Sequence, residues 1–559
     1  MKQNKTKLTK KEINVRFNIV AMICICIFAV GIVGKTLQND TYYTITLGKY
    51  ILNNGIDMME HFSWHEGLIY TYPHWLYDIG IYLIYNTFGF FGIYVSTIVL
   101  TAILWISIYA VASKLSKNNL VSLFVTLLVL FLGKEYMTAR AQLVTFILFV
   151  WTIYFIESFL DTKKIKYAIG LIIIPIIIAN VHAAVFPFYF VLFLPYIGEY
   201  IIALIIENKN LLFKLFIKLD KNKINKLSKK SNITKKETEQ IEKLTNRIEK
   251  NEAKEEKRKK SIENKKGKEY KIIVNKRDNV KWLILIMIVC AFTGLLTPIG
   301  DTPYTYLIHT MQGNTTGNIN EHLPLVLANS TNACIIFGAY LIILTFTKTK
   351  IRLSDLFLAL GLIVLSFKTR RQVSMVLFIS VFAFNNILVN LINNWDTERE
   401  IDEVKEYFTT ILGRILIFII IALLTAIMLD KGKNNKIVNE SQYPVEACDY
   451  ILENLDVENI KLFNDYNYGS YLMFRGIPVF IDSRADVYDP KFNGLKDDIF
   501  QDYISLSGLN CYYEDKFEHY GITHVMTYAN SKLSLYISKD SRYKEIYKDK
   551  SFVIYENNK

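Results

Sequence analysis

The chain has 559 residues, of which 52% are hydrophobic, 14% aromatic and 21% charged, and its formal net charge is +13. Segment 207–280 holds 24 Lys and Arg against 12 Asp and Glu and therefore carries nearly all of this charge. Because the rest of the chain is close to neutral, the composition favours a membrane protein and excludes nucleic acid as an expected partner.

Apolar runs recur from the N-terminal region to residue 430. A run of about 18 or more apolar residues can cross a hydrocarbon core about 30 Å thick. The runs lie at 18–36, 90–113, 119–133, 141–160, 167–181, 183–206, 282–298, 331–348, 353–367, 372–392 and 411–429. They predict a polytopic α-helical membrane protein with about eleven transmembrane helices.

Basic residues orient the chain in the membrane. The leader is rich in lysine and no small-residue cleavage signal follows the first span, so this span is expected to be a retained anchor with a cytoplasmic N-terminus. The expected parts are a leader (1–16), an N-terminal transmembrane module (17–206) with a first outer loop (37–75), a basic cytoplasmic insert (207–280), a C-terminal transmembrane module (281–430) and an extracytoplasmic domain (431–559).

Two of these parts lie outside the membrane modules. The insert 207–280 either lies on anionic lipid headgroups or forms a solvated helical hairpin. The tail 431–559 is expected to be a small α/β domain, with a helix at 443–455 and β-type runs at 460–463, 479–481, 521–528 and 547–555. Its Cys448 and Cys511 could form a disulfide, or could be unpaired core residues.

Asp40 is the first acidic residue after the first span. A carboxylate held at the membrane surface could act as a general base on an acceptor hydroxyl. Alternatively, Asn39 or Asp40 caps a helix predicted over 41–52, which ends at Gly55. The two interpretations are compatible.

A second polar group follows in the same outer loop. Glu60 is a carboxylate, and His61 and His65 have the i, i+4 spacing that suits a metal on a helix. Asp40, Glu60 and His65 could therefore hold a divalent metal. Because Gly55 and Trp64 indicate an irregular loop, ligation is the minority interpretation.

Three arginines are expected on the outer face. Arg140 follows the third apolar run, and Arg370 and Arg371 lie beside Lys368. Guanidinium groups at this depth need an anionic partner, and phosphate suits them because Arg donates in bidentate fashion. The alternative is that Arg370 and Arg371 are cytoplasmic anchors. At another outer end, Asn180 and His182 are expected either to form a hydrogen-bonded structural pair or to line a cavity.

The motifs together resemble a known family. The segment NDTYYTITLGKYILNNGIDMMEHFSW looks like the first outer loop of bacterial membrane glycosyltransferases with the GT-C fold. The segments ARAQ and NVHAA resemble their Ala-Arg-Pro-Gln and Asn-x-His-Gly motifs, and LTPIGDTPY resembles a later loop. The tail KLFNDYNYGSYLMFRGIPVFIDSRADVY matches one branch with an outer C-terminal domain, and is more weakly similar to oligosaccharyltransferase catalytic subunits.

The resemblance implies dependence on a dolichyl- or polyprenyl-phosphate sugar, as in mannosyltransferases and aminoarabinose transferases. Asp40 would be the catalytic base, and Arg140 with Arg370 or Arg371 would bind the donor phosphate. The expected sugar and acceptor pocket consists of Tyr43, Glu60, His61, Trp64, His65, His74, Asn180 and His182. The expected acceptor contacts of the outer domain are Asp465, Tyr466, Asp482, Arg484 and Asp486. Asp482 and Arg484 could instead form an internal pair that holds this domain together.

The chain departs from the family pattern at several positions. Glu60 stands where the family has Asp, Ala141 replaces a proline, and Ala183-Ala184 replaces a glycine. The basic insert is absent from the pattern. Asp40 is retained.

The expected function is an inverting transfer of a sugar to a cell-envelope glycan, lipid or protein on the outer face of a bacterial plasma membrane. The expected partners are the lipid-linked donor, that acceptor and membrane lipids. The alternatives are a lipid-linked oligosaccharide polymerase or transporter, and a non-catalytic scaffold whose outer domain binds envelope polymer. Few charges occur inside the spans, which argues against a transport path.

Overall fold

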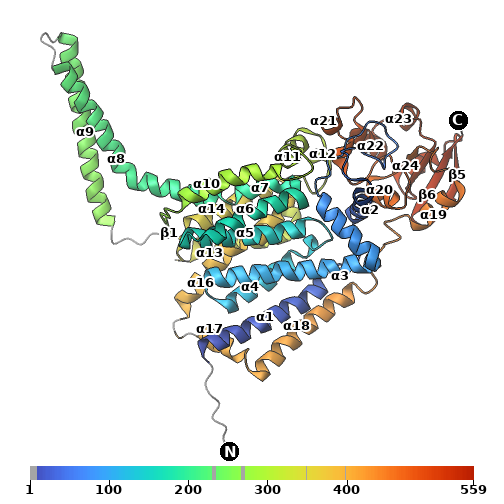
Figure 1. The fold of residues 1–559 in the computed structure, drawn as a ribbon, viewed down its shortest axis with the longest axis horizontal. Helices are drawn as coiled ribbons and strands as arrows, with labels where there is room; N and C mark the ends of the chain where they lie inside the picture. The colour runs from blue at the N-terminus through green and yellow to red at the C-terminus, as the bar shows by residue number, and fades with distance from the viewer. Residues whose placement is uncertain are drawn as a thin grey trace, which may run out of the picture.

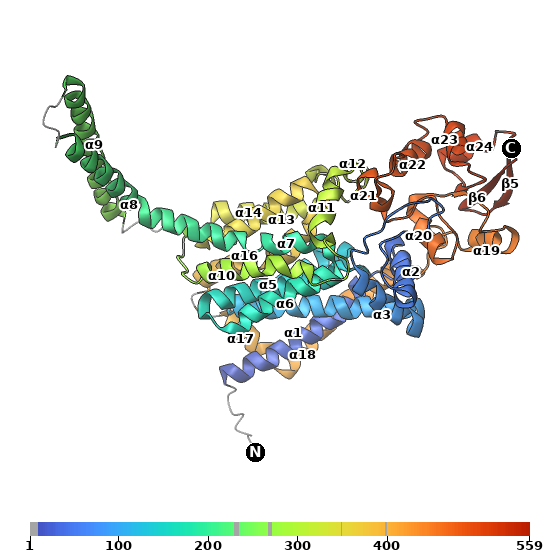
Figure 2. The same ribbon diagram turned by 45° about the horizontal axis from the view of Figure 1, so that its top comes forward.

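The computed structural model describes residues 9–228, 234–265, 271–347, 349–396, 398 and 400–558. In Figures 1 and 2 most helices lie side by side in a bundle, with the C-terminal region at one end and a long helical hairpin at the other. The first part of the predicted leader lies outside the described residues.

The bundle contains a helix in each predicted apolar run. Its helices are α1 (Lys10–Ile32), α3 (Trp75–Ser116), α4 (Asn119–Leu132), η1 (Lys134–Tyr136), α5 (Gln142–Thr162), α6 (Ile165–Val181), η2 (Ala183–Val185), α7 (Phe186–Val191), α8 (Leu194–Ser228), α10 (Val280–Phe292), η3 (Thr293–Leu295), α13 (Thr331–Phe346), α14 (Leu353–Lys368), η5 (Arg370–Gln372), α15 (Val373–Ile379), α16 (Val381–Trp395), α17 (Glu400–Tyr407) and α18 (Ile411–Lys431).

Within the described chain, five helical segments are long and apolar enough to cross a membrane. They are Lys10–Ile32, Trp75–Ser116, Gln142–Thr162, Ala183–Glu207 and Ile411–Lys431, and the bent pair Arg370–Ile379 and Val381–Trp395 would make six. The expected count of about eleven is not confirmed, because four apolar helices have only 10–17 residues.

Helix α3 is longer than the run that predicted it. The predicted span began at residue 90, and the helix breaks at Gly89, whose φ of 62° is left-handed backbone that favours glycine. The preceding part of α3 lies at one end of the bundle, where Figure 1 shows it beside α2 (Asn39–Asn54).

The basic insert forms the predicted helical hairpin. Helix α8 runs out of the bundle and α9 (Lys235–Lys265) runs back alongside it, as both views show. Asp220 and Arg247 join the two helices through an ion pair of 2.7 Å. A short parallel pair, β1 (Ile272–Ile273) and β2 (Ile351–Arg352), lies where the chain re-enters the bundle. Residues 229–233 and 266–270 of the insert lie outside the described residues.

Outside the bundle, the connecting segments contain α11 (Thr302–Gln312), α12 (Thr315–Asn318) and η4 (Leu327–Asn329). The C-terminal region contains α19 (Val445–Asn454), β3 (Leu462–Phe463), α20 (Tyr466–Phe474), η6 (Ala485–Tyr488), α21 (Pro490–Asn493), α22 (Ile499–Gly508), α23 (Tyr513–Tyr520), β4 (His524–Tyr528), α24 (Lys532–Ile537), β5 (Tyr543–Lys548) and β6 (Phe552–Asn557).

The C-terminal strands form a mixed sheet in the order β3-β4-β6-β5, in which only the β3–β4 pair is parallel. The predicted β-type run at 479–481 is not part of this sheet. Val479 instead makes an isolated parallel bridge with Ser63 of the first outer loop. Cys448 and Cys511 are both free thiols, so the disulfide alternative is wrong.

The hydrophobic core has two main bodies. One fills the bundle between α1, α3, α4, α5 and α15. The other runs without interruption from α2 and the first outer loop into the C-terminal region, including Tyr42, Tyr72, Tyr471 and Phe480. The C-terminal region is therefore packed onto the outer loop, and the cavity described next lies at this junction.

Candidate active site

A cavity of about 930 Å³, lined by both polar and apolar side chains, lies between the α2 end of the bundle and the C-terminal region. Helices α2, α5, α11 and α15 contribute to its wall, as do α20 and α22 of the C-terminal region. The predicted site residues that line it are Asp40, Tyr43, His74, Arg140, His182, Arg371, Tyr466, Arg484 and Asp486. The structure thus gathers residues that the sequence spreads over more than 400 positions.

Asp40 and Arg140 face each other at the cavity wall. Arg140, in the turn before α5, places Nη2 2.9 Å from Asp40 Oδ2. Its Nη1 donates to both carboxylate oxygens of Glu321, at 3.0 and 3.2 Å. One guanidinium therefore joins the first outer loop to the loop after α12. About a quarter of the Asp40 side chain is exposed, so the carboxylate remains accessible from the cavity.

The structure corrects the capping interpretation of Asp40. Helix α2 begins at Asn39, and its N-cap residue is Gln38. Asn39 donates its amide to the Tyr466 carbonyl, and Asp40 pairs with Arg140. Neither side chain caps the helix, because both are taken up by partners from distant parts of the chain. The C-terminal prediction is confirmed: α2 ends before Gly55, whose φ is 85°.

Arg370 and Arg371 lie in different surroundings. Arg371 lines the cavity together with Lys368. With the Gln142 amide oxygen facing it, the Arg371 guanidinium donates to that oxygen at 2.7 and 2.9 Å. Arg370 is not among the lining residues, and its Nε donates to the Pro324 carbonyl at 3.3 Å. Arg371 therefore lies at the same end of the bundle as Asp40, with which it shares a cavity.

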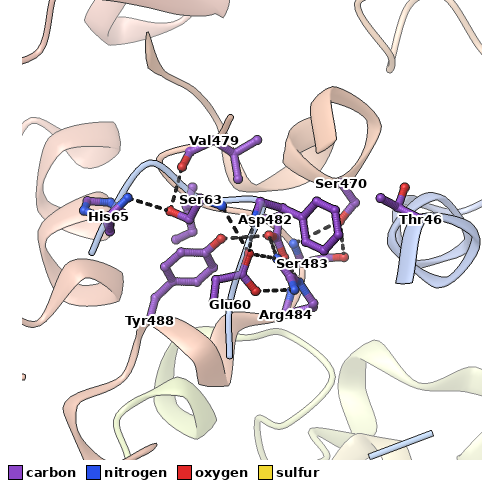
Figure 3. A network of polar contacts seen from close by, with 12 residues as sticks. Thr46, Glu60, Ser63, His65, Ser470, Val479, Asp482, Ser483, Arg484 and Tyr488 are labelled. Atoms are coloured by element: carbon purple, nitrogen blue, oxygen red, sulfur yellow. Dashed lines mark hydrogen bonds and ion pairs between the residues drawn. The ribbon is translucent and has the colours of Figure 1, made fainter. Parts of the chain in front are cut away.

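Glu60 does not belong to the cavity wall. Figure 3 shows its carboxylate against Arg484, which also pairs with Asp482, and Tyr488 donates to Asp482. The Nη1 of Arg484 lies 2.5 Å from Glu60 and its Nη2 lies 2.6 Å from Asp482. All three charged side chains are at most 3% exposed. The alternative of an internal Asp482–Arg484 pair is therefore confirmed, and Glu60 extends this pair into the first outer loop.

The aromatic residues and histidines of the first outer loop pack on the C-terminal region. Trp64 donates its indole N–H to the Leu462 carbonyl at 3.0 Å, and His65 Nε2 lies 3.1 Å from the Phe480 carbonyl. His61 pairs with Asp57 at 2.6 Å. The structure does not place His61, Trp64 or His65 in the cavity wall, because the loop is irregular and its side chains pack against the domain.

The metal interpretation is not supported by this geometry. No group of three or more His, Cys, Asp or Glu in the described residues is arranged to hold a metal ion. The predicted ligands are occupied by other partners: Asp40 by Arg140, Glu60 by Arg484, and His65 by a backbone carbonyl. The donor set therefore does not fit a divalent metal.

Asn180 and His182 do not bond to each other. His182 is buried, lines the cavity and has Nδ1 2.9 Å from the Thr145 hydroxyl. Asn180 donates to the carbonyls of Ile176 and Leu296 and is not among the lining residues. His182 therefore lines the cavity, whereas Asn180 joins α6 to the Leu296 carbonyl.

The predicted acceptor residues of the C-terminal region fall into two groups, those that line the cavity and those that do not. Tyr466 and Asp486 line the cavity, whereas Asp465 caps α20 through the Asn467 amide. Tyr306 donates to Asp486 at 2.5 Å. Burial raises the pKa of Asp486 above its ordinary range, although hydrogen bonds from Tyr306 and Thr315 oppose this.

Several cavity residues were missed by sequence reasoning. Glu321, His322 and Tyr306 are all on the wall. Burial alone would raise the pKa of Glu321, but Arg140 and Arg371 outweigh it and lower that pKa. Burial and Arg371 lower the pKa of His322 to about 4, so the imidazole is neutral at pH 7. The available signal was the polar segment NINEH in a predicted outer loop.

The chain is similar to solved structures of other proteins. No protein-family model and no curated protein matches the chain. Two crystal structures of the Archaeoglobus fulgidus oligosaccharyltransferase cover 91% of this chain and 69% of the archaeal one. The structure with a tethered acceptor peptide containing the NVT sequon has 11% identity and a TM-score of 0.51. The apo form has 10% identity and a TM-score of 0.52.

This is a GT-C fold. The similarity supports the GT-C-like helical fold expected from the outer-loop motifs. Together with the apolar helices, the GT-C fold indicates a membrane protein. At such low identity the similarity shows the fold alone.

Proposed function

We propose that the protein is a membrane glycosyltransferase that moves a sugar from a polyprenyl-phosphate donor to an acceptor hydroxyl. The observation that carries this proposal is a carboxylate, Asp40, within 2.9 Å of Arg140 on the wall of one cavity that also contains Arg371. A base and two phosphate-binding cations are the groups that such a transfer needs.

The wall offers separate surroundings for the parts of the donor. Arg140 and Arg371 supply the positive charge that suits a phosphate. Phe146, Phe149 and Leu365 of the bundle supply an apolar side of the same cavity, which suits a prenyl chain. The sugar would then lie between the phosphate and Asp40.

Arg140 would take part both in the ion pairs with Asp40 and Glu321 and in binding the donor phosphate. It is shared between Asp40 and Glu321. A donor phosphate competes with these carboxylates for the guanidinium, because Arg binds phosphate in bidentate fashion. Binding of the donor would thereby draw Arg140 away from Asp40 and leave that carboxylate free to accept a proton.

In the chemical step the acceptor oxygen forms a bond to the anomeric carbon as the bond from that carbon to the phosphate oxygen breaks. Asp40 takes the proton of the acceptor hydroxyl, and the phosphate leaves with the bonding electron pair. Arg140 and Arg371 stabilise the charge that develops on it. Attack opposite to the leaving group inverts the anomeric configuration.

The acceptor would enter from the C-terminal side of the cavity, where Tyr466 and Asp486 lie. Glycan, lipid and protein acceptors of the cell envelope all present hydroxyl or amide groups. The archaeal neighbour was solved with an acceptor peptide, which keeps a protein acceptor among these classes. We place the cavity on the outer face of a bacterial plasma membrane, because the basic leader and the basic insert favour the cytoplasm.

The test measures sugar release from a polyprenyl-phosphate hexose by the purified protein in detergent. Asp40→Asn and Arg140→Ala should each lower turnover by about a hundredfold or more. Asp57→Asn is the matched control, since Asp57 is an outer-loop carboxylate that binds Tyr50, Tyr72 and His61. Equal turnover by all four proteins would refute the assignment of the site. A folded wild type that turns over no polyprenyl-phosphate hexose would favour the scaffold alternative.

A further inference from the structure

A second set of polar groups, formed by Tyr43, His74 and Asp78, lies near Asp40 and has no role in the transfer step. His74 Nδ1 lies 2.7 Å from Asp78 Oδ1, and His74 Nε2 lies 3.3 Å from the Tyr43 hydroxyl. Asp78 is fully buried, whereas Tyr43 and His74 line the cavity. From the interior to the cavity, the groups therefore follow in the order Asp78 carboxylate, His74 imidazole and Tyr43 phenol.

Burial raises the pKa of Asp78, and the contact with His74 opposes this rise. With Asp78 ionised, its carboxylate can only accept, so the proton of a neutral imidazole lies on Nδ1. Nε2 is then an acceptor, and the Tyr43 hydroxyl must donate to it. Burial and the negative charges of Asp40 and Asp78 raise the pKa of Tyr43 well above its ordinary range, which keeps this hydroxyl protonated.

Close packing of α2 on α3 holds these three hydrogen-bonded side chains in place. A Cβ at Gly48 of α2 would collide with the Asp78 carbonyl oxygen, so only glycine permits this approach. The rings of Tyr43 and His74 are stacked, with centroids 5.7 Å apart and an interplanar angle of 29°. The phenol therefore has a fixed position and a fixed hydrogen-bond direction.

Tyr43 lies close to Asp40, the proposed base, on α2. Asp40 and Tyr43 are three residues apart in α2, on one face of the helix, and both line the cavity. Because the Tyr43 proton is committed to His74, the lone pairs of its oxygen are left for a group in the cavity.

We propose that Tyr43 accepts a hydrogen bond from a hydroxyl of the bound sugar, and that His74 and Asp78 are positioning residues that fix Tyr43 as an acceptor. This inference rests on the proposed function and names a polyhydroxylated donor sugar as the group recognised. It separates the roles of neighbouring residues: Asp40 acts on the acceptor proton, and Tyr43 orients the donor.

The test compares Tyr43→Phe, His74→Leu, His74→Gln and Asp78→Asn with the wild type, using a polyprenyl-phosphate hexose as donor. Tyr43→Phe and His74→Leu should each raise KM for the donor by about fivefold to tenfold, the loss of one hydrogen bond. His74→Gln should restore most of the wild-type KM, because the Gln amide oxygen can accept from Tyr43. Asp78→Asn should raise KM, because its amide no longer enforces the Nδ1–H tautomer.

Coupling between the residues separates positioning from a merely structural role. If His74 acts through Tyr43, the variant carrying both Tyr43→Phe and His74→Leu should have the KM of Tyr43→Phe alone. Tyr50→Phe is the matched control in α2, since its hydroxyl binds Asp57 and it is not among the lining residues. Thermal unfolding identifies variants that are merely destabilised.

Additive effects in the double variant, or a wild-type KM for Tyr43→Phe, would overturn the inference while leaving the proposed function intact. A wild type without turnover would overturn the proposed function and this inference together.

Discussion

At the scale of single residues, two adjacent arginines have different roles. Either was a candidate to bind phosphate together with Arg140, but of the two only Arg371 lines the cavity. The backbone N–H groups of Arg370 and Arg371 donate to the carbonyls of Leu323 and Glu321. These bonds fix the short helix η5 so that one guanidinium faces the cavity and the other the Pro324 carbonyl.

The two arginines therefore form a matched pair of variants. We expect Arg371→Ala to lower kcat about a hundredfold, because it removes a cation that stabilises the leaving phosphate. Arg370→Ala should keep kcat within about threefold of the wild type, since its side chain makes one long bond to a carbonyl. Turnover and the unfolding temperature are measured for both. A larger loss of kcat in Arg370→Ala would contradict the assignment.

At the scale of elements, the part of the first outer loop that follows α2 has little regular secondary structure and is nevertheless fixed. The backbone N–H of Trp64 donates to the Val479 carbonyl, and the backbone N–H of Val479 donates to the Phe62 carbonyl. His65 lies among Trp64, Phe480 and Tyr520. Burial lowers the pKa of His65 to about 4, so the folded loop favours the neutral imidazole.

This histidine makes the stability of the folded protein depend on pH. In the unfolded chain a His has a pKa of about 6.5. The contribution of neutral His65 is therefore present above about pH 6.5 and is lost as the pH falls from there towards 4. We expect His65→Gln to reduce the slope of the unfolding midpoint against pH in this window, measured by chemical unfolding in detergent. An identical slope would show that His65 titrates alike in both states.

At the scale of the whole molecule, the C-terminal region closes the cavity because it is attached to the first outer loop. The two share one hydrophobic core. Glu60 and Arg484, which are 424 positions apart, form the buried ionic contact between them. Figure 3 shows this contact within a wider network of hydrogen bonds.

Removal of Glu60 should loosen this attachment. We expect Glu60→Ala to destabilise the protein by about 3 kcal/mol, because it leaves a buried guanidinium partly uncompensated. Glu440→Ala is the control, since the Glu440–Lys436 pair is 58% and 65% exposed and should contribute less than about 1 kcal/mol. The free energy of unfolding and the rate of proteolysis between the bundle and the C-terminal region are measured. Equal effects of the two variants would argue against a buried clamp.

Much of the fold was predictable because its signals are local. Each apolar run contains a helix, α2 ends at Gly55, and α3 breaks where the predicted span began. The number of membrane-crossing helices was less predictable, since four apolar helices are too short by themselves. The run at 479–481 was predicted to be a strand from its composition, but its bridge partner is in the first outer loop.

The sequence alone determined the segregation of apolar and polar segments, the helical bundle and the presence of acidic and basic groups in the segments that join its helices. These properties follow from the hydrophobicity and charge of neighbouring residues. Only the tertiary structure decided that Asp40 faces the cavity while Glu60 is buried. The reason is that Arg140 and Arg484, the partners of these two carboxylates, come from distant parts of the chain and are brought close only by packing.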